Sequence, residues 1–566
     1  MTDSPRTLPT DSGGRRRGRA FRAARYWAQS VQSSSRCLAF WAQYRRILGP
    51  SGIVAREKRL LVVSFMGNFL AGIQQEGMLV KALQLCGCEP YIVSDRLRFV
   101  ALAYRVFGFE RFVWFNEYLR DDARALAACE ARELVAKVKS LADLLALRYQ
   151  EVAVGKHVAS TLIRTTYRFE FDMRAKRERD FIEEMIRVVI LNVFAARRVM
   201  DEIQPEIALF LERGYSPYGE FFDLCVNRGI NTIQWCGCHR ESAIMLKRYS
   251  LENADRHPAS LSAKSWNVAR SMPWSQGHDD ALHHELYGNY VSGKWFSEVG
   301  TQFNKRIIDR EELIARLGLD PGKMTAVIFA HIFWDASFFW GEDLFESYEE
   351  WLVETVRSAC ANDRLNWIVK LHPANIVKLR RDGYVGEPAE TTVLREKVGP
   401  LPPHVRVLEG ETDVNTYALF YVMNFCLTVR GTIGIEAAAF GATVLTAGSG
   451  RYDGYGFTVD SQSREAYMAR LAALPSCPES DALAVDLAKR FAHASFVMRP
   501  FNLASMKTSN ANDRLATRRI DISLRSAEEL EQAPDLRSFA AWALDTRAED
   551  YLDTEAARDG GRVLVR

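Results

Sequence analysis

The apolar residues of this chain gather in short runs that alternate with longer amphipathic segments. Runs rich in aliphatic residues predict buried strands in the first half at Arg59–Phe65, Ile207–Leu211 and Thr232–Trp235. Runs with the same pattern recur in the second half at Ala326–Ala330, Trp367–Leu371, Val405–Leu408, Phe425–Val429 and Thr443–Thr446. Runs that stay apolar without alternation are typical of parallel strands covered on both faces.

Helical spacing dominates between these runs. It is clearest at Glu133–Leu147 and Arg179–Arg198, and it recurs near 311–317, 347–360, 414–421 and 481–493. Strands that alternate with helices favour an α/β fold, and here the alternation occurs in two halves. We therefore predict a cleft between two α/β domains, and five regions: a basic, partly disordered extension (1–50), an N-terminal domain with a helical insertion (51–265), a bridge (266–320), a C-terminal domain (321–500) and a helical tail (501–566).

Composition narrows the classes of function. The chain has 566 residues and a net charge of +3, which is too balanced to favour nucleic acid as a partner. Ten scattered cysteines suggest reduced thiols and a cytoplasmic protein. No apolar run reaches the length of a membrane span, and no signal-peptide core follows the first arginines.

The basic, aromatic segment from Phe21 to Leu48 has two interpretations. A helix of this composition can lie on the anionic face of the inner membrane, as a peripheral contact. It can equally dock on the protein's own surface. The sequence shows no clean apolar stripe that decides between them.

The turn after Phe425–Val429 is the most informative stretch of the chain. Gly431 and Gly434 allow a sharp turn and a close approach of the backbone to a ligand, and Thr432 can cap the helix that follows. In a parallel sheet this turn lies at the carboxyl edge, where such folds bind phosphates. Glu436 either complements the helix dipole or accepts hydrogen bonds from the two hydroxyls of a nucleotide ribose.

A second strand end points to the same edge. Lys370-Leu371-His372-Pro373 closes the strand at Trp367–Leu371, and Pro373 turns the backbone away from the sheet. His372 can donate to a phosphate there, and Lys370 can add positive charge. The alternative for His372 is a buried residue whose hydrogen bonds are satisfied within the fold.

These motifs together resemble a known family. The Lys-x-His-Pro strand end, the later Arg430-Gly-Thr-Ile-Gly-Ile-Glu436-Ala-x3-Gly441 turn and the Gly448-x-Gly450-x-Tyr452 loop are similar to the capsule polysaccharide biosynthesis transferases. These are bacterial glycosyltransferases of the GT-B fold, with two Rossmann-like domains facing across a cleft, and some of them transfer Kdo from its CMP-activated form. The similarity covers mainly residues 320–500.

The resemblance implies a sugar nucleotide held by the C-terminal domain. His372 would contact the donor phosphate, with Lys370 nearby, and Glu436 would hold the ribose. The remaining implied positions are the phosphate pocket (Arg430, Gly431, Thr432, Gly434) and the residues that close over the sugar (Tyr452, Asp453). Such transferases need no bound metal, and the chain shows no Asp-x-Asp motif. We expect no further cofactor.

An acceptor hydroxyl also calls for a base. The candidates, in order of preference, are Glu76, Asp335 and Glu212, which follow predicted strands. The Cys86-Gly-Cys88 and Cys236-Gly-Cys238 pairs are too closely spaced for the usual zinc site and indicate small apolar residues beside turns.

The predicted function is transfer of a sugar from a CMP- or NDP-sugar to a capsular or other surface glycan, or to a lipid-linked acceptor. Three alternatives remain at this level. One is a polymer-building transferase of the glycerol phosphate type. Another is an epimerase of the sugar nucleotide, and the last is a non-catalytic scaffold in capsule assembly.

Overall fold

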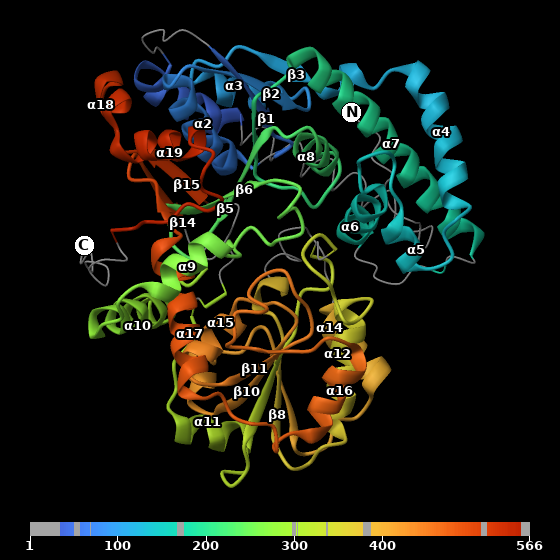
Figure 1. The fold of residues 1–566 in the computed structure, drawn as a ribbon, viewed down its shortest axis with the longest axis vertical. Helices are drawn as coiled ribbons and strands as arrows, with labels where there is room; N and C mark the ends of the chain where they lie inside the picture. Colours follow the sequence, from blue (N-terminus) through green and yellow to red (C-terminus); the bar gives the residue numbers. More distant parts are fainter. Residues whose placement is uncertain are drawn as a thin grey trace.

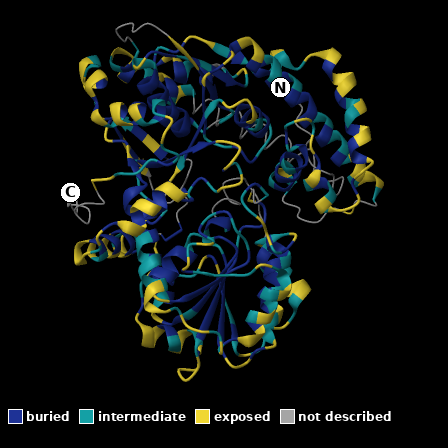
Figure 2. Ribbon diagram, in the orientation of Figure 1, coloured by how far each residue is buried: buried dark blue, intermediate teal, exposed yellow. Residues whose placement is uncertain are grey.

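The computed structural model describes residues 34–49, 57–67, 69–166, 172, 175–296, 301–302, 304–335, 338–376, 387–510 and 518–555. The chain folds into two α/β lobes, one above the other in Figure 1. Both sheets are buried within their lobes, whereas exposed residues lie on the surrounding helices and loops (Figure 2). The predicted fold of two Rossmann-like domains with added helices is therefore confirmed.

The N-terminal lobe is built on a seven-stranded sheet with the order β13-β6-β5-β4-β1-β2-β3. Strands β1 to β5 are parallel, and β6 and β13 join one edge in antiparallel pairing. Leu60 to Val63 of β1 have no exposed surface, as a central parallel strand requires. The strands are β1 (Lys58–Val63), β2 (Cys88–Ser94), β3 (Phe112–Trp114), β4 (Ile207–Phe210), β5 (Asn231–Gly237), β6 (Ala243–Tyr249) and β13 (Phe501–Asn502).

Helices cover both faces of this sheet. The expected helical insertion lies between β3 and β4 and consists of α4 to α7, the longest of which is α7. The helical elements of this lobe are α2 (Leu70–Leu85), α3 (Arg98–Arg105), η1 (Phe115–Tyr118), α4 (Asp121–Val135), α5 (Leu141–Ala146), α6 (Val154–Thr166), α7 (Lys176–Ile203) and α8 (Tyr218–Asn227).

Residues 34–48 form a helix that docks on the N-terminal lobe. Cys37, Phe40, Tyr44 and Leu48 are buried in the same apolar core as α2 and α3. Their spacing of three and four residues places them on one face of the helix. Of the two interpretations of the basic segment, docking on the protein's own surface is the one observed for these residues. Residues 1–33 lie outside the described part of the chain.

The C-terminal lobe contains a six-stranded, fully parallel sheet with the order β12-β11-β10-β7-β8-β9. Its strands are β7 (Thr325–Phe329), β8 (Asn366–Lys370), β9 (Val405–Leu408), β10 (Met423–Thr428), β11 (Thr443–Thr446) and β12 (Val459–Asp460). The helical elements are α12 (Tyr348–Cys360), α14 (Ala389–Val393), η3 (Leu394–Val398), η4 (Thr416–Tyr421), α15 (Ile433–Ala439), α16 (Arg464–Ala473), α17 (Ala482–His493) and η5 (Ala494–Met498).

The bridge between the lobes is helical over its described residues. It contains α9 (Ala263–Ser271), α10 (Gln276–Val291) and α11 (Arg310–Leu317). Tyr290 and Trp295 belong to the apolar core that α10 shares with α15 and α17. The bridge therefore forms part of the C-terminal lobe's packing and contributes side chains to the edge of its sheet.

After η5 the chain returns to the N-terminal lobe. Figure 1 shows this returning tail in red beside the blue helices. This tail contains strands as well as helices: β13, the hairpin of β14 (Met506–Asn510) and β15 (Arg518–Ile522), then α18 (Ala527–Gln532) and α19 (Pro534–Leu544). The helical tail expected over 501–566 therefore contains strands as well among its described residues. Strands of two to five residues are too short to show a period in the sequence.

A buried carboxylate fixes the returning chain. Asp550 receives the ammonium of Lys247 at 3.0 Å and the guanidinium of Arg499 at 3.5 Å, and it accepts a hydrogen bond from the Ser262 backbone N–H at 2.7 Å. All three charged residues are at most 3% exposed. Burial alone would raise the pKa of Asp550, but Arg499 and Lys247 hold that pKa far below its usual value.

Removing this charge should destabilise the whole protein. We expect Asp550→Asn to lower the free energy of unfolding by about 3–5 kcal/mol, because Arg499 would remain buried without its counter-ion and Lys247 would keep only Glu549. Asp545→Asn is the matched control, since Asp545 pairs with Arg547 at the surface, where solvent screens the interaction. Urea unfolding of both variants measures the difference. Equal, small losses would show that the buried charges do not hold the tail.

Candidate active site

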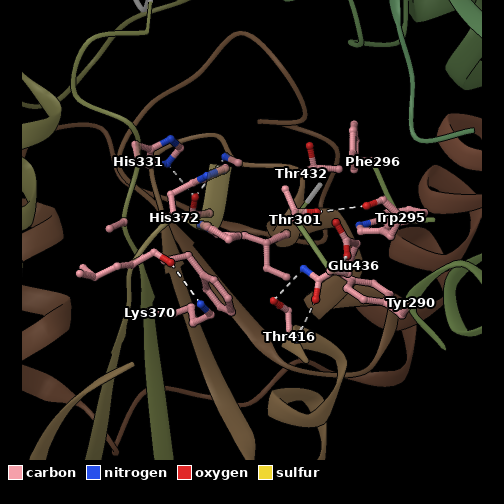
Figure 3. A pocket seen from close by; sticks show the side chains of 18 residues that line it. Tyr290, Trp295, Phe296, Thr301, His331, Lys370, His372, Thr416, Thr432 and Glu436 are labelled. Atoms are coloured by element: carbon pink, nitrogen blue, oxygen red, sulfur yellow. Dashed lines mark hydrogen bonds between the residues drawn. The ribbon is translucent and has the colours of Figure 1, made fainter. Parts of the chain in front are cut away.

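A cavity of about 220 Å³ lies at the carboxyl edge of the C-terminal sheet (Figure 3). Strands β7, β8 and β10 end at it, and α15 and the bridge complete its wall. Sites of parallel α/β sheets form at such edges. The lining residues are Tyr290, Trp295, Phe296, Thr301, Gln302, Phe329, Ala330, His331, Lys370, Leu371, His372, Pro373, Thr416, Thr428, Gly431, Thr432, Ile433 and Glu436.

Aromatic side chains of the bridge form one wall. The rings of Tyr290 and Trp295 stack with their centroids 5.2 Å apart, and Phe296 meets Trp295 edge-on at 5.3 Å. Trp295 also contacts the imidazole of His239 at 4.8 Å. His239 follows β5, so this wall touches the N-terminal lobe. Flat apolar rings of this kind suit a planar ligand group such as a nucleobase.

Glu436 places a carboxylate in the same cavity. The residue is 2% exposed, and the Tyr290 hydroxyl donates a hydrogen bond to its Oε2. Burial raises the pKa of Glu436 to about 7, although the Tyr290 hydrogen bond opposes this shift. Its Oε1 accepts no hydrogen bond from any described residue, so this oxygen remains available to a ligand hydroxyl.

Two imidazoles lie on the opposite side of the cavity. The Val429 backbone N–H donates to His331 Nε2 at 3.1 Å, and the Ala374 N–H donates to His372 Nδ1 at 3.2 Å. In each neutral ring these contacts assign the proton to the other nitrogen. Burial, aided by His372 and nearby arginines, lowers the pKa of His331 to about 3. His331 is therefore a neutral donor at physiological pH.

The predicted turn lies at the cavity, but its parts have different roles. Gly431 and Thr432 line the cavity, whereas Gly434 supports the turn from behind. A Cβ at Gly434 would lie 2.3 Å from the Tyr452 hydroxyl, which donates to the Gly431 carbonyl at 2.8 Å. The prediction that Thr432 caps the helix through its side chain is wrong, because that side chain makes no capping hydrogen bond.

Four predicted donor-site residues direct their side chains elsewhere. Lys370 lines the cavity, yet its ammonium donates to the carbonyls of Leu371 (3.2 Å) and Glu409 (3.4 Å). Arg430 lies outside the lining, where its guanidinium is bound to Asp343. Asp453 accepts from the backbone N–H groups of its own loop and does not line the cavity, and Tyr452 is buried behind the turn. The sequence placed Lys370 and Arg430 correctly at strand ends, but it did not show the direction of their side chains.

Glu76, the first choice for a catalytic base, is in the core of the N-terminal lobe. It has no exposed surface, and it accepts hydrogen bonds from Tyr104 at 2.5 Å and Trp235 at 3.3 Å. Burial raises its pKa to about 7. Placing Glu76 on the cleft is therefore a wrong prediction. The sequence located it after a strand but did not show which side of α2 faces the sheet.

The other two candidate carboxylates, Glu212 and Asp335, come from different lobes. Glu212 follows β4 and accepts the backbone N–H groups of Arg213 and Gly214, each at 2.7 Å. Burial raises the pKa of Glu212, and the charge of Asp335 from the C-terminal lobe adds to this. Neither carboxylate lines the donor cavity.

The sequence alone did not identify the bridge residues of the cavity. Tyr290, Trp295, Gln302 and Thr416 precede or separate the strands and belong to no motif. His331 follows the end of β7, the same kind of position that drew attention to His372.

The described residues contain no group of three or more His, Cys, Asp or Glu able to hold a metal ion. No helix within that part of the chain is long and apolar enough to cross a membrane.

No family model and no curated protein matches the sequence. Similar solved structures include KpsC, a beta Kdo 2,4 transferase of Thermosulfurimonas dismutans, at 12% identity and a TM-score of 0.32, covering 58% of this chain and 87% of that one. Neisseria meningitidis UDP-GlcNAc 2-epimerase (TM-score 0.26) and the spinosyn rhamnosyltransferase SpnG (TM-score 0.25) are each 10% identical, with 77% of this chain and 96% of theirs covered. Kdo transferases are thus among the solved structures that this chain is similar to. This likeness assigns no substrate.

Glu76 should make stability depend on pH. Its pKa is about 7 in the folded protein and near 4.5 when exposed, so the folded state holds a proton that the unfolded state releases. This contribution is complete below pH 4.5 and is lost as the pH rises through 7. We expect wild type to lose up to about 3 kcal/mol relative to Glu76→Gln between pH 4.5 and 8. Denaturation at several pH values measures this, and the exposed Glu133→Gln variant is the control. A constant difference would contradict the assignment.

Proposed function

We propose that this protein is a glycosyltransferase that binds a nucleotide-activated sugar in the cavity of its C-terminal lobe. The observation that carries the proposal is the combination of groups around that cavity. An aromatic wall, a buried carboxylate and two imidazole donors surround a single space of about 220 Å³. These groups match, in order, the base, the ribose and the phosphate of a nucleotide.

Glu436 and the wall fix the nucleoside. A base packed on Tyr290 and Trp295 brings its ribose hydroxyls towards Glu436 Oε1, because Tyr290 is bound to the other oxygen of the same carboxylate. The wall and the carboxylate therefore act as one unit. Hydrogen bonds to an ionised carboxylate contribute about 1.5–3 kcal/mol each, enough to select a nucleotide over free phosphate.

The phosphate end is where the chemistry occurs. During transfer, the bond from the anomeric carbon to the phosphate oxygen breaks, and a bond to the acceptor oxygen forms. Negative charge grows on the departing phosphate, and donors fixed in advance stabilise it. The N–H groups of His331 and His372 and the backbone of the Gly431 turn are such donors. Neutral His331 serves as a donor without requiring a counter-ion.

The acceptor proton needs a receiver on the other side of the sugar. Glu212 and Asp335 come from different lobes and interact electrostatically, and burial raises the pKa of Glu212. We assign the base to this pair in place of Glu76. The acceptor we propose is a surface or capsular glycan or its lipid-linked form, as the motif resemblance implies.

Charge distribution supports work at a cytoplasmic membrane surface. The first 49 residues contain ten arginines and two aspartates, although the entire chain has a net charge of only +3. The remainder is therefore slightly acidic, and the positive charge is concentrated at one end. Basic segments of this kind are attracted to anionic lipid.

Replacing Glu436 should weaken nucleotide binding selectively. We expect one nucleotide or sugar nucleotide among the CMP, CDP, UDP and GDP series to raise the melting temperature of wild type, and Glu436→Gln to bind it at least tenfold more weakly. Glu390→Gln is the matched control, because burial also raises the pKa of Glu390 to about 7 but the residue lies outside the cavity. No shift with any nucleotide, or equal shifts in both variants, would defeat the donor assignment.

The same binding should strengthen with pH. Glu436 has a pKa of about 7 in the free protein, and its ionised form is the better acceptor for ribose hydroxyls. Between pH 6 and 8 its ionised fraction rises from about 10% to about 90%, so affinity should rise up to about tenfold. Calorimetric titration with a sugar nucleotide whose phosphates do not titrate in this range measures it. Glu436→Gln should give a flat profile, and a falling wild-type profile would contradict the assignment.

A further inference from the structure

The helix of residues 34–48, here called the docked helix, has an outer side that the fold leaves in solvent. Its inner face is buried in the N-terminal lobe. Outside that face, residues spaced by three and four form a stripe along the helix. We call this set the outer stripe. It consists of Leu38, Trp41, Ala42, Arg45 and Arg46, which are exposed apart from the half-buried Trp41.

Both ends of the docked helix are tied to the lobe. The buried ammonium of Lys81 donates to the carbonyl of Gly49, just after the helix, at 3.2 Å, and to the carbonyl of Phe107 at 3.1 Å. A cation at this end also complements the helix dipole. At the other end, the Arg36 guanidinium donates to the Arg518 carbonyl of β15 at 2.8 Å. The N-terminal lobe therefore presents the outer stripe as a preformed surface.

The outer stripe combines apolar and basic side chains. Leu38 is 55% exposed, so most of the apolar surface that burial would stabilise remains in water. The guanidinium of Arg45 lies over the ring of Trp41, 3.9 Å from its centroid. Tryptophan and arginine together are typical of segments at the surface of a bilayer, where the ring lies at the level of the headgroups and the charge remains among the phosphates.

The charge of the adjoining chain favours an anionic partner. Residues 34–49 contain three arginines and no acidic residue, and residues 1–33 contain seven arginines and two aspartates. Because residue 33 leads directly into the docked helix, these charges are tethered to the same face of the lobe. In a chain with a net charge of +3, ten positive and two negative charges here leave the remainder with a net charge of −5. The positive charge is therefore local.

The apolar part of the outer stripe distinguishes a bilayer from other anionic partners. Nucleic acid attracts arginines through its phosphates, but it offers no apolar layer to an aliphatic side chain. An anionic bilayer offers phosphates to Arg45 and Arg46 and an apolar layer to Leu38 and Trp41. A lipid surface therefore accounts for both halves of the stripe.

We propose that the outer stripe is a docking surface that places the N-terminal lobe on an anionic lipid bilayer. Leu38 and Trp41 enter at the level of the headgroups, while Arg45 and Arg46, together with the arginines of residues 1–33, bind lipid phosphates. The inference rests on the proposed function in one respect, the location at a membrane surface, and it does not depend on the donor cavity. The two interpretations of the basic segment are then compatible, because the docked helix uses a different side for each.

Co-sedimentation of the full chain with lipid vesicles tests the inference. One set of vesicles contains phosphatidylcholine alone, and the other also contains the anionic lipid phosphatidylglycerol. We expect wild type to bind only the second set, and to bind it less as the salt concentration rises. Leu38→Glu should weaken that binding at least tenfold, and so should the double variant Arg45→Gln with Arg46→Gln.

Matched controls come from α4, which lies across the N-terminal lobe from α2 and α3 in Figure 1. Leu126 is 48% exposed, so Leu126→Glu introduces the same charge at a comparable surface position. The double variant Arg124→Gln with Arg132→Gln removes the same two charges from exposed positions. Both controls should bind the anionic vesicles like wild type.

Melting temperatures of the same variants, with and without nucleotide, separate this inference from the donor assignment. The helix variants should melt like wild type, which shows that they fold, and should keep the wild-type nucleotide shift. No binding of wild type to the anionic vesicles, or equal binding by helix variants and controls, overturns the inference even if the nucleotide shift persists. Retention on immobilised DNA without vesicle binding also overturns it. Vesicle binding that depends on the outer stripe, without any nucleotide shift, would support the docking surface and reject the proposed donor site.

Discussion

The arrangement of the two lobes depends on one buried carboxylate. Asp550 neutralises Lys247 of β6 and Arg499, which leads the chain out of the C-terminal lobe. Because charges buried this deeply must be paired, the returning chain is held in place where it crosses between lobes. The triad thus joins β6 of the N-terminal lobe, the segment that follows η5 and the end of the tail. None of its three residues lines the donor cavity.

Three buried glutamates have similarly raised pKa values but different access to a ligand. Burial raises the pKa of Glu76, Glu390 and Glu436 to about 7 alike. Glu76 is enclosed by Tyr104 and Trp235, and Glu390 by the C-terminal core, so neither faces a space that a substrate can enter. Glu436 alone among these three lines a cavity. A shifted pKa thus identifies a buried acid, and the neighbouring space decides whether that acid can serve a ligand.

The sequence predicted most of the framework, because parallel strands require continuous apolar runs and such runs are visible in one dimension. It also located the turn at Gly431, His372 and Glu436 at one sheet edge, where the structure brings them together. It did not show the side-chain directions of Arg430 and Lys370, since each strand-end residue has more than one way to turn. The aromatic wall was not predicted, because Tyr290 and Trp295 become part of the site only when the bridge folds back on α15 and α17.

The Trp295 ring contacts side chains on both sides of the junction between the lobes, His239 after β5 and Tyr290 of α10. One neighbour of its ring is His239 after β5, and the ring also lines the donor cavity. A rotation that separates the lobes must therefore move this ring, slide it against His239, or break their contact. The shape of the nucleoside pocket and the angle between the lobes then belong to one conformational equilibrium, and a ligand that prefers one pocket shape shifts the lobes by its difference in affinity for the two states. The contact between Trp295 and His239 therefore couples the angle between the lobes to the shape of the donor cavity.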